Sequence, residues 1–332
     1  MKSYGGLFAR ILDPANLEAA LERAARGKRE RDPVQRLLAE RATVLPRLRE
    51  ALAAGTYRPR PYEQFAICDP KPRRISCAHF RDRVVHHAVC AVLAPLIERR
   101  LIADNYACRV GKGSHRALLR AQDCARRHAW FLKTDIRRYY DSIDHAILLA
   151  KLDTLCREPA LRRLLAVIVE HPIPGQRPGK GLPIGNLTSQ WFANLYLDEV
   201  DHWIKEVERI PGYVRYMDDL ALWADDKERL FALAADLRAL LAARLGLELK
   251  EEGTLIAPVG EGMPFLGWRV YPGLLRQQGP RLRRQRRLLA RREAQYLAGE
   301  IGADKLQDCV RALAGPRKFL GYGEPLRSSI DV

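Results

Sequence analysis

Apolar residues recur at helical spacing along most of the chain. Between residues 13 and 55, Ala and Leu are interspersed with Arg and Glu up to Gly55, which predicts two helices that break near Asp32 and Pro33. An amphipathic helix is expected from Arg83 to Leu101. Further helices are predicted over residues 114–128, 143–155, 189–204 and 227–245, and from about residue 281 to the end.

Shorter apolar runs predict strands. Residues 57–76 are rich in proline and are expected to be extended, and Trp130 to Ile136 is expected to form a strand. Residues 213–215 and 220–223 flank a polar pair, which predicts a strand–turn–strand hairpin. A Pro/Gly-rich loop is predicted over residues 172–185, and short strands with glycine turns over residues 247–271.

The predicted hairpin carries two adjacent carboxylates, Asp218 and Asp219, at its tip. Carboxylates held close together repel each other unless a positive charge lies between them, and a divalent metal ion is the usual solution. An exposed acidic turn is the alternative, because Asp is a favoured turn residue. A metal site therefore needs a further carboxylate from elsewhere in the chain.

Asp135 supplies that carboxylate at the end of the predicted strand. Two metal ions about 4 Å apart need at least one bridging Asp and further oxygen ligands from a separate strand. Taken alone, Asp135 is equally compatible with a surface position or a helix cap. Asp141 or Ser142 can cap the next helix, and we assign Asp141 and Asp144 to surface or capping roles.

Composition favours a polyanionic partner. The 332 residues carry a net charge of +17, which points to nucleic acid before an anionic membrane surface. There is no apolar run of 18 residues and no signal-peptide pattern at the N-terminus, so no membrane association is expected. Seven cysteines without a Cys-x-x-Cys pair are typical of reduced thiols in a cytoplasmic protein, and a zinc site is not expected.

Asp135, followed by Tyr140 and then by Tyr216-Met217-Asp218-Asp219, resembles the catalytic motifs of reverse transcriptases. The resemblance is collinear from about residue 57 to residue 270. It implies an α+β right-hand polymerase fold with fingers, a palm built on an antiparallel sheet, and a short helical thumb. The domains expected are an N-terminal helical extension (1–56), fingers (57–128), a palm (129–280, with a fingers-like insertion at about 145–180) and a basic thumb (281–332).

The resemblance implies that Asp135, Asp218 and Asp219 are catalytic and hold two Mg²⁺ ions, with Mn²⁺ able to substitute. Ile136 joins the three carboxylates in the implied metal site. Tyr216 and Met217, in the same motif as Asp218, are implied to contact the nucleotide.

Other motifs resemble the family's nucleotide-binding positions. Lys71, Arg73 and Arg74 resemble the finger motif that grips the triphosphate of a dNTP, with Arg74 the best candidate; a solvated basic turn is the alternative. Tyr140 matches the aromatic gate that excludes a 2′-hydroxyl, although a core aromatic is also compatible. The segment 181–190 resembles the motif that positions the nascent base pair, through Ile184, Gly185 and Gln190.

Nucleic-acid contacts are implied on both sides of the palm. Lys112 lies in a segment that resembles a template-side loop, and Phe265, Leu266 and Gly267 resemble the primer grip, although an ordinary core strand is nearly as compatible with Phe265 and Leu266. The thumb arginines expected to follow the duplex backbone are Arg281, Arg283, Arg284 and Arg287. The family often has a Lys near Gly253, and Lys250 is a weak substitute for it.

Ile184-Gly185 and Ser189-Gln190 depart from most of the family and are similar to reverse transcriptases of diversity-generating retroelements. This similarity implies error-prone copying of a template RNA into cDNA, concentrated at template adenines. The expected partners are template RNA, the RNA/cDNA duplex, dNTPs, and a small basic accessory protein or structured non-coding RNA. The alternatives are a reverse transcriptase of an antiphage defence system or other retroelement, and a non-catalytic nucleic-acid-binding protein.

Overall fold

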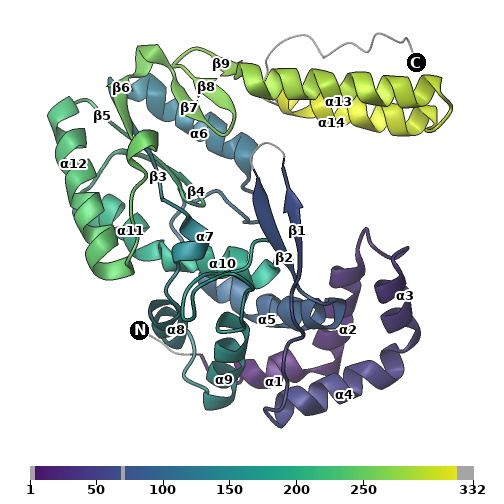
Figure 1. The fold of residues 1–332 in the computed structure, drawn as a ribbon. Helices are drawn as coiled ribbons and strands as arrows, with labels where there is room; N and C mark the ends of the chain where they lie inside the picture. The colour runs from purple at the N-terminus through teal and green to yellow at the C-terminus, as the bar shows by residue number, and fades with distance from the viewer. Residues whose placement is uncertain (1–3, 69–71, 320–332) are drawn as a thin grey trace. The chain divides into compact units, whose positions relative to one another are not determined.

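The computed structural model describes residues 4–68 and 72–319, and the chain divides into two interleaved units. The first unit comprises residues 1–103, 136–203 and 237–249, and the second comprises residues 104–135, 204–236 and 250–332. Helices and antiparallel sheets both contribute to the fold, so the α+β class predicted from the sequence is confirmed (Figure 1).

The first unit is mainly helical. Its helices are α1 (Leu7–Leu12), α2 (Pro14–Ala25), α3 (Asp32–Ala39), α4 (Arg41–Ala53), α5 (Phe80–Glu98), α7 (Tyr139–Ser142), α8 (His145–Asp153), α9 (Pro159–Val169), α10 (Leu187–Tyr196) and α11 (Asp198–His202). Helix α5 packs against α1, α2 and α10 and is buried on most of its surface. Its apolar residues therefore form the centre of this unit.

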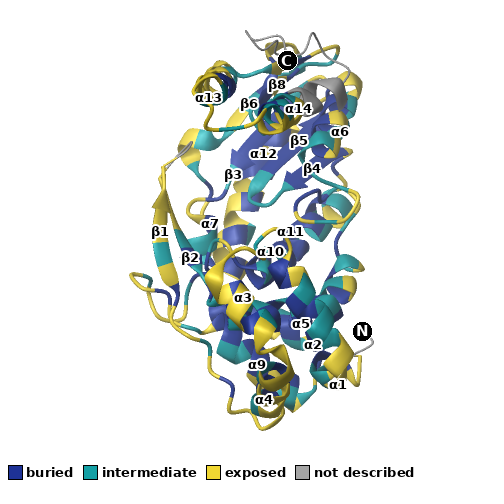
Figure 2. Ribbon diagram, turned by 90° about the vertical axis from the view of Figure 1, so that its right-hand side faces the viewer, coloured by how far each residue is buried: buried dark blue, intermediate teal, exposed yellow. Residues whose placement is uncertain are grey.

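A two-stranded ribbon extends the first unit. Strand β1 (Glu63–Ile67) pairs antiparallel with β2 (Arg73–Cys77), and β1 is largely exposed (Figure 2). The ribbon is attached near its base, because the backbone N–H of Ser76 donates to the carbonyl of Ile184 at 3.2 Å. At Gly185, whose φ is +115°, an added Cβ would lie 3.1 Å from the Ile75 side chain. The ribbon and the 184–185 loop are thus in close contact.

The second unit is built on a four-stranded antiparallel sheet. Its strand order is β4 (Gly212–Tyr216), β5 (Asp219–Ala224), β3 (Trp130–Asp135) and β6 (Leu255–Pro258). Helix α6 (Ser114–Arg127) packs on β4 and β5, and Phe131 and Trp223 are fully buried in the core that it covers. Helix α12 (Lys227–Leu240) follows β5 along the chain.

A smaller sheet and a helical hairpin complete the second unit. The sheet is formed by β7 (Met263–Phe265), β8 (Trp268–Val270) and β9 (Leu275–Gln277). The helices α13 (Gly279–Leu297) and α14 (Ala303–Phe319) pack together through a small core of Leu289, Leu306 and Leu313. No helix within residues 4–68 and 72–319 is long and apolar enough to span a membrane.

Several local expectations are confirmed and others are wrong. The hairpin at residues 212–224 and the strand that ends at Asp135 form as predicted. Residues 13–55 form three helices instead of two: a helix begins at the predicted break, Asp32, but a further break at Glu40 separates α3 from α4. The helix predicted over 189–204 begins earlier and is divided into α10, α11 and a π-helical turn over Trp203–Val207.

Candidate active site

Three carboxylates meet where the central strands of the larger sheet pair. Asp135 ends β3 and lies directly opposite Asp219, the first residue of β5. Side chains at directly opposite positions of antiparallel strands have Cβ atoms about 4.5–5.5 Å apart. Tyr216 pairs with Asp219 across the hairpin, so Met217 and Asp218 form the two-residue turn. The turn places Asp218 beside the facing pair.

The turn is held in an uncommon backbone conformation. Met217 has a φ of +57°, a region that residues other than glycine seldom occupy. The guanidinium of Arg215, which is fully buried, donates a hydrogen bond of 3.0 Å from Nη1 to the carbonyl of Met217. This hydrogen bond from a buried arginine stabilises the turn that carries Asp218. All four residues from Tyr216 to Asp219 are half-buried.

Burial and neighbouring charge both disfavour ionisation of Asp135 and Asp218. Burial, followed by the charge of Asp135, raises the pKa of Asp218 to about 7. Burial also raises the pKa of Asp135, and the charge of Asp219 adds to the effect. Asp135 and Asp218 share a side-chain hydrogen bond, which requires one proton between them because an ionised carboxylate can only accept. The cluster therefore favours a proton or a cation.

A buried lysine provides part of the compensating charge. Lys133 lies on β3, and its ammonium forms an ion pair with Asp219 and donates to the carbonyl of Thr134 at 3.2 Å. Lysine is seldom buried unless it is paired. Lys133 was not predicted as a site residue, because a single charge within an apolar strand gives no motif.

The donor set fits a hard divalent cation, although it does not form a ready-made cage. Within the described residues, no three His, Cys, Asp or Glu side chains already converge as metal ligands. Magnesium retains several waters and needs only one or two carboxylates, which Asp135 and Asp218 offer with raised pKa values. Ile136 is buried and continues the chain beyond Asp135.

Lys250 lies beside Asp135. Its backbone N–H donates to the Asp135 carbonyl at 2.8 Å, and its charge lowers the pKa of the Asp135 carboxyl. A Cβ added at Gly253 would lie 3.5 Å from Lys250 Cδ and 3.7 Å from Asp135 Cβ. Lys250, which the sequence offered only weakly, is therefore a second lysine, after Lys133, whose charge acts on the Asp135 carboxyl.

The nucleotide-binding candidates lie mainly in the first unit. Arg73 and Arg74 are exposed on β2, and Lys71 lies outside the described residues. The backbone contacts of β2 bring Arg74 close to the loop of Ile184 and Gly185. Gln190 is half-buried in α10.

Tyr140 follows Tyr139, whose side chain is buried and hydrogen-bonded in the core. Tyr139 is buried and donates from its hydroxyl to the carbonyl of Ala193 at 2.5 Å. The ring of Tyr140 is only half-buried and lies edge-on to that of Tyr139, with centroids 5.8 Å apart. Tyr139 therefore has the core role, and Tyr140 retains an accessible ring.

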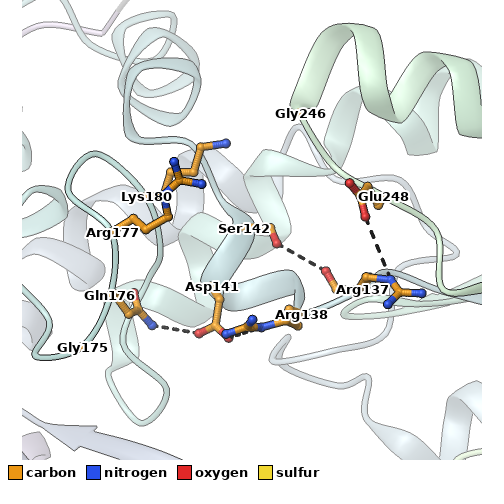
Figure 3. Close-up of a pocket in the computed structure, with 10 residues that line it drawn as sticks. All are labelled: Arg137, Arg138, Asp141, Ser142, Gly175, Gln176, Arg177, Lys180, Gly246 and Glu248. Carbon is orange, nitrogen blue, oxygen red and sulfur yellow. Dashed lines mark hydrogen bonds and ion pairs between the residues drawn. The ribbon is translucent and has the colours of Figure 1, made fainter.

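The capping role allowed for Asp144 is confirmed, whereas the cap suggested for Asp141 or Ser142 is wrong. Asp144, and neither Asp141 nor Ser142, caps α8 by accepting hydrogen bonds from the backbone of Ala146 and Ile147 at 3.0 and 3.2 Å. Asp141 and Ser142 instead lie in α7 and line a cavity of about 480 Å³ (Figure 3).

The candidate nucleic-acid residues differ in exposure. Phe265 is buried in the core of the second unit, which favours the core-strand alternative for its side chain. Leu266 and Gly267 form the turn between β7 and β8, with φ values of +48° and +81°. Arg281 is half-buried, donates to the Leu266 carbonyl at 2.9 Å and lies 5.8 Å from the centre of the Trp268 ring. Its guanidinium secures this turn.

The remaining basic candidates are more accessible. Arg283, Arg284 and Arg287 are exposed on α13. Lys112 is half-buried between two glycines with positive φ, and its ammonium lies 4.7 Å from the centre of the Tyr106 ring. Exposed arginines along one helix suit a polyanion backbone.

Comparison with known proteins gives a consistent family. A family model described as "Reverse transcriptase (RNA-dependent DNA polymerase)" matches residues 68–270. Protein YkfC of Escherichia coli (strain K12) is 25% identical over 277 residues, which cover 70% of this chain and 73% of that protein. The group II intron-encoded protein LtrA of Lactococcus lactis subsp. cremoris is 22% identical over 290 residues, which cover 67% of this chain and 48% of LtrA.

Among solved structures, apo telomerase from Candida tropicalis is similar with a TM-score of 0.49 and 10% identity, covering 65% of this chain and 48% of that chain. The chain thus spans about half the length of LtrA and of the telomerase chain that it matches.

Proposed function

Because the chain belongs to the reverse transcriptase (RNA-dependent DNA polymerase) family, we propose that it synthesises cDNA on an RNA template. The observation that carries this proposal is the pairing of Asp135 with Asp219 beside Asp218. A relic fold that only bound nucleic acid would have no need to retain three adjacent carboxylates, two of which, Asp135 and Asp218, have pKa values raised by burial and by a neighbouring carboxylate.

In the proposed reaction the three aspartates hold divalent cations, two Mg²⁺ ions or Mn²⁺. Bound there, such cations favour ionisation of the primer 3′-hydroxyl and neutralise charge on the triphosphate. Asp135 and Asp218 would supply carboxylate ligands, and their raised pKa values show that this pair favours a nearby positive charge. Lys133 holds Asp219 in place, and Arg215 keeps the turn rigid. The protein thus supplies positioning and fixed charge, which dominate phosphoryl-transfer catalysis.

Selection of deoxynucleotides is assigned to Tyr140. Its ring lies edge-on to the buried Tyr139, and this support favours a gate that excludes a 2′-hydroxyl. Arg74 is assigned to the triphosphate because a guanidinium binds phosphate oxygens in pairs. We propose the larger sheet as the palm, the β1–β2 ribbon as part of the fingers and α13–α14 as the thumb.

Template and product contacts are assigned to basic surfaces. The exposed arginines of α13, namely Arg283, Arg284 and Arg287, are proposed to follow the RNA/cDNA duplex. Leu266 and Gly267 are proposed to approach the primer strand through their tight turn, where glycine allows close backbone contact.

The biological role proposed is mutagenic copying in a diversity-generating retroelement. Ile184 supports it, because an apolar side chain cannot make the hydrogen bonds that an amide would make to a nascent base pair. A reverse transcriptase of another retroelement is the second candidate, favoured by the similarity to a group II intron-encoded protein.

Primer extension on a defined RNA template, followed by sequencing of the cDNA, tests both the polymerase activity and the proposed mutagenic role. Wild-type protein is expected to extend the primer only with a divalent cation, and Asp218→Asn is expected to lose at least about a thousandfold of the rate. Asp236→Asn, an exposed aspartate of the second unit, is the matched control. Extension by Asp218→Asn at the wild-type rate would exclude the proposed chemistry. Errors concentrated at template adenines support the mutagenic role, and an even, low error rate supports the second candidate.

A further inference from the structure

A strongly basic cavity of about 480 Å³ lies within the first unit (Figure 3). Its charged lining residues are four cations and two acids: Arg137, Arg138, Arg177, Lys180, Asp141 and Glu248. We propose that this cavity binds a di- or triphosphate group, and that Arg177 and Lys180 are its principal anion-binding side chains. The proposal rests on the proposed function, since a polymerase takes up a triphosphate and releases pyrophosphate.

The two acids of the cavity are already engaged. Asp141 accepts a hydrogen bond of 2.8 Å from Gln176 Nε2 and another of 3.3 Å from Arg138 Nε. Glu248 lies 4.0 Å from Arg137 Nε, on the opposite wall (Figure 3). Neither acid is therefore directed at Arg177 or Lys180.

Arg177 and Lys180 retain most of their capacity to bind an anion. Among the described residues, no acidic side chain pairs with Arg177, which is exposed at the rim. Lys180 reaches only Asp144, at the outer limit of an ion pair, 4.0 Å. Both side chains extend from the 175–180 loop on one side of the cavity (Figure 3). The 175–180 loop therefore presents two cations that can still accept an anion.

The loop that carries these cations has a defined shape. Gly175 and Gly179 have φ values of +79° and +76°, which most other residues avoid. A Cβ added at Gly181 would overlap Gln176 Oε1, so the close packing of Gln176 depends on that glycine. The cavity wall is therefore built into the loop and does not result from loose surface side chains.

Arg74 adds a further positive charge at the edge of the cavity. A Cβ added at Gly175 would lie 2.8 Å from Arg74 Nη1, so this guanidinium is against the Gly175 backbone. Arg137 and Arg138 follow Asp135 by two and three residues in the sequence. The cavity thus combines residues that follow the first catalytic motif with the 175–180 loop, which has no assigned role, and Arg74 of the finger motif lies next to it.

The size of the cavity and the two lightly paired cations of its loop favour a compact polyanion. A di- or triphosphate concentrates about three to four negative charges on neighbouring phosphorus atoms, whereas a nucleic-acid strand carries one charge per nucleotide along an extended track. Cavities of roughly 300–1,000 Å³ are typical for small ligands. We therefore favour a small polyphosphate over the nucleic-acid backbone.

Calorimetric titration with inorganic pyrophosphate tests the site in the full chain. Wild-type protein is expected to bind, and the double variant Arg177→Gln/Lys180→Gln is expected to bind roughly tenfold to a hundredfold more weakly. Arg157→Gln removes an exposed arginine of the same unit outside the cavity and is expected to bind like wild type. The charge-conserving variant Arg177→Lys/Lys180→Arg should retain binding within a fewfold. It separates loss of charge from loss of fold.

Primer-extension kinetics distinguish the two sources of the ligand. If the cavity holds released pyrophosphate, the inhibition constant for added pyrophosphate rises by the same factor in the Gln double variant while the KM for dNTP is unchanged. If it holds the incoming nucleotide, the KM for dNTP rises instead. Both outcomes support the site.

Wild-type pyrophosphate affinity in the Gln double variant overturns the proposal. So does a loss of RNA affinity without any loss of pyrophosphate affinity, which would identify a nucleic-acid track. Pyrophosphate binding needs no polymerase turnover. A protein that binds pyrophosphate but fails to extend primers would therefore refute the proposed function and leave this site intact.

Discussion

Replacing Asp218 by asparagine is expected to stabilise the metal-free protein at neutral and alkaline pH. In the native state, burial and the neighbouring Asp135 raise the pKa of Asp218 to about 7, against 3.8 for an ordinary aspartate. Between these values the folded protein holds a proton that the unfolded chain releases. The free energy of unfolding of the wild type therefore falls as the pH rises from about 4 to about 7.

The raised pKa of Asp218 sets an upper limit on the gain in unfolding free energy. A difference of about three pKa units corresponds to about 4 kcal/mol at about 1.36 kcal/mol per unit. The true value is smaller because Asp135 and Asp218 share the proton. In the Asp218→Asn variant the new amide can still donate a hydrogen bond to Asp135 and carries no charge, so the variant lacks this pH-dependent loss. We expect a gain of about 1–3 kcal/mol at pH 8 and almost none at pH 4.

Urea unfolding with EDTA at pH 4, 6 and 8 measures the difference directly. Asp236→Asn, on an exposed position of α12, should follow the wild-type curve at each pH. Saturating Mg²⁺ should stabilise the wild type and close the gap, because a bound cation replaces the shared proton. A lower stability of Asp218→Asn than of wild type at pH 8 would refute this explanation. So would a difference in unfolding free energy between the two proteins that does not grow with pH.

Three further changes give defined outcomes. Lys133→Met should destabilise the metal-free protein by about 1–3 kcal/mol, because Asp219 loses its partner. Mn²⁺ should then raise the melting temperature of the variant more than that of wild type. An equal rise in both proteins would contradict the role of Lys133. Gly267→Ala should destabilise the second unit by about 1–3 kcal/mol, because φ is +81° and the new Cβ would lie 2.9 Å from Arg281 Nη1; an unchanged urea midpoint would contradict it. Ile184→Gln should lower the frequency of errors at template adenines in sequenced cDNA without abolishing extension, and an unchanged error spectrum would remove Ile184 from fidelity control.

The elements that position the carboxylates could be predicted because their signals are local. Asp135 ends a short apolar strand, and Asp218 and Asp219 separate two others. The short apolar runs and the turn residues between them were therefore enough to predict these strands. The number of N-terminal helices was not predictable in this way, because Ala, Leu, Arg and Glu favour helix on both sides of each break.

Other features depend on tertiary structure and have no local signal. Lys133 appears as one charge in an apolar strand until its ammonium is found at Asp219. Phe265 matched a nucleic-acid motif, but its side chain is part of the core. The basic cavity combines positions from about 137 to 248, and no sequence window contains them all. Its charges were visible in the sequence only as part of the overall surplus.

The interleaving of the two units has a consequence for how the chain folds during synthesis. The first unit needs residues up to 249, and the second begins at residue 104 and continues past residue 250. Neither can be completed until about three quarters of the 332 residues have left the ribosome. Helix α5, whose buried face packs on α10, has to remain partly uncovered until residue 196 has emerged. This chain should therefore depend on chaperones more than a protein of the same length with two sequential domains.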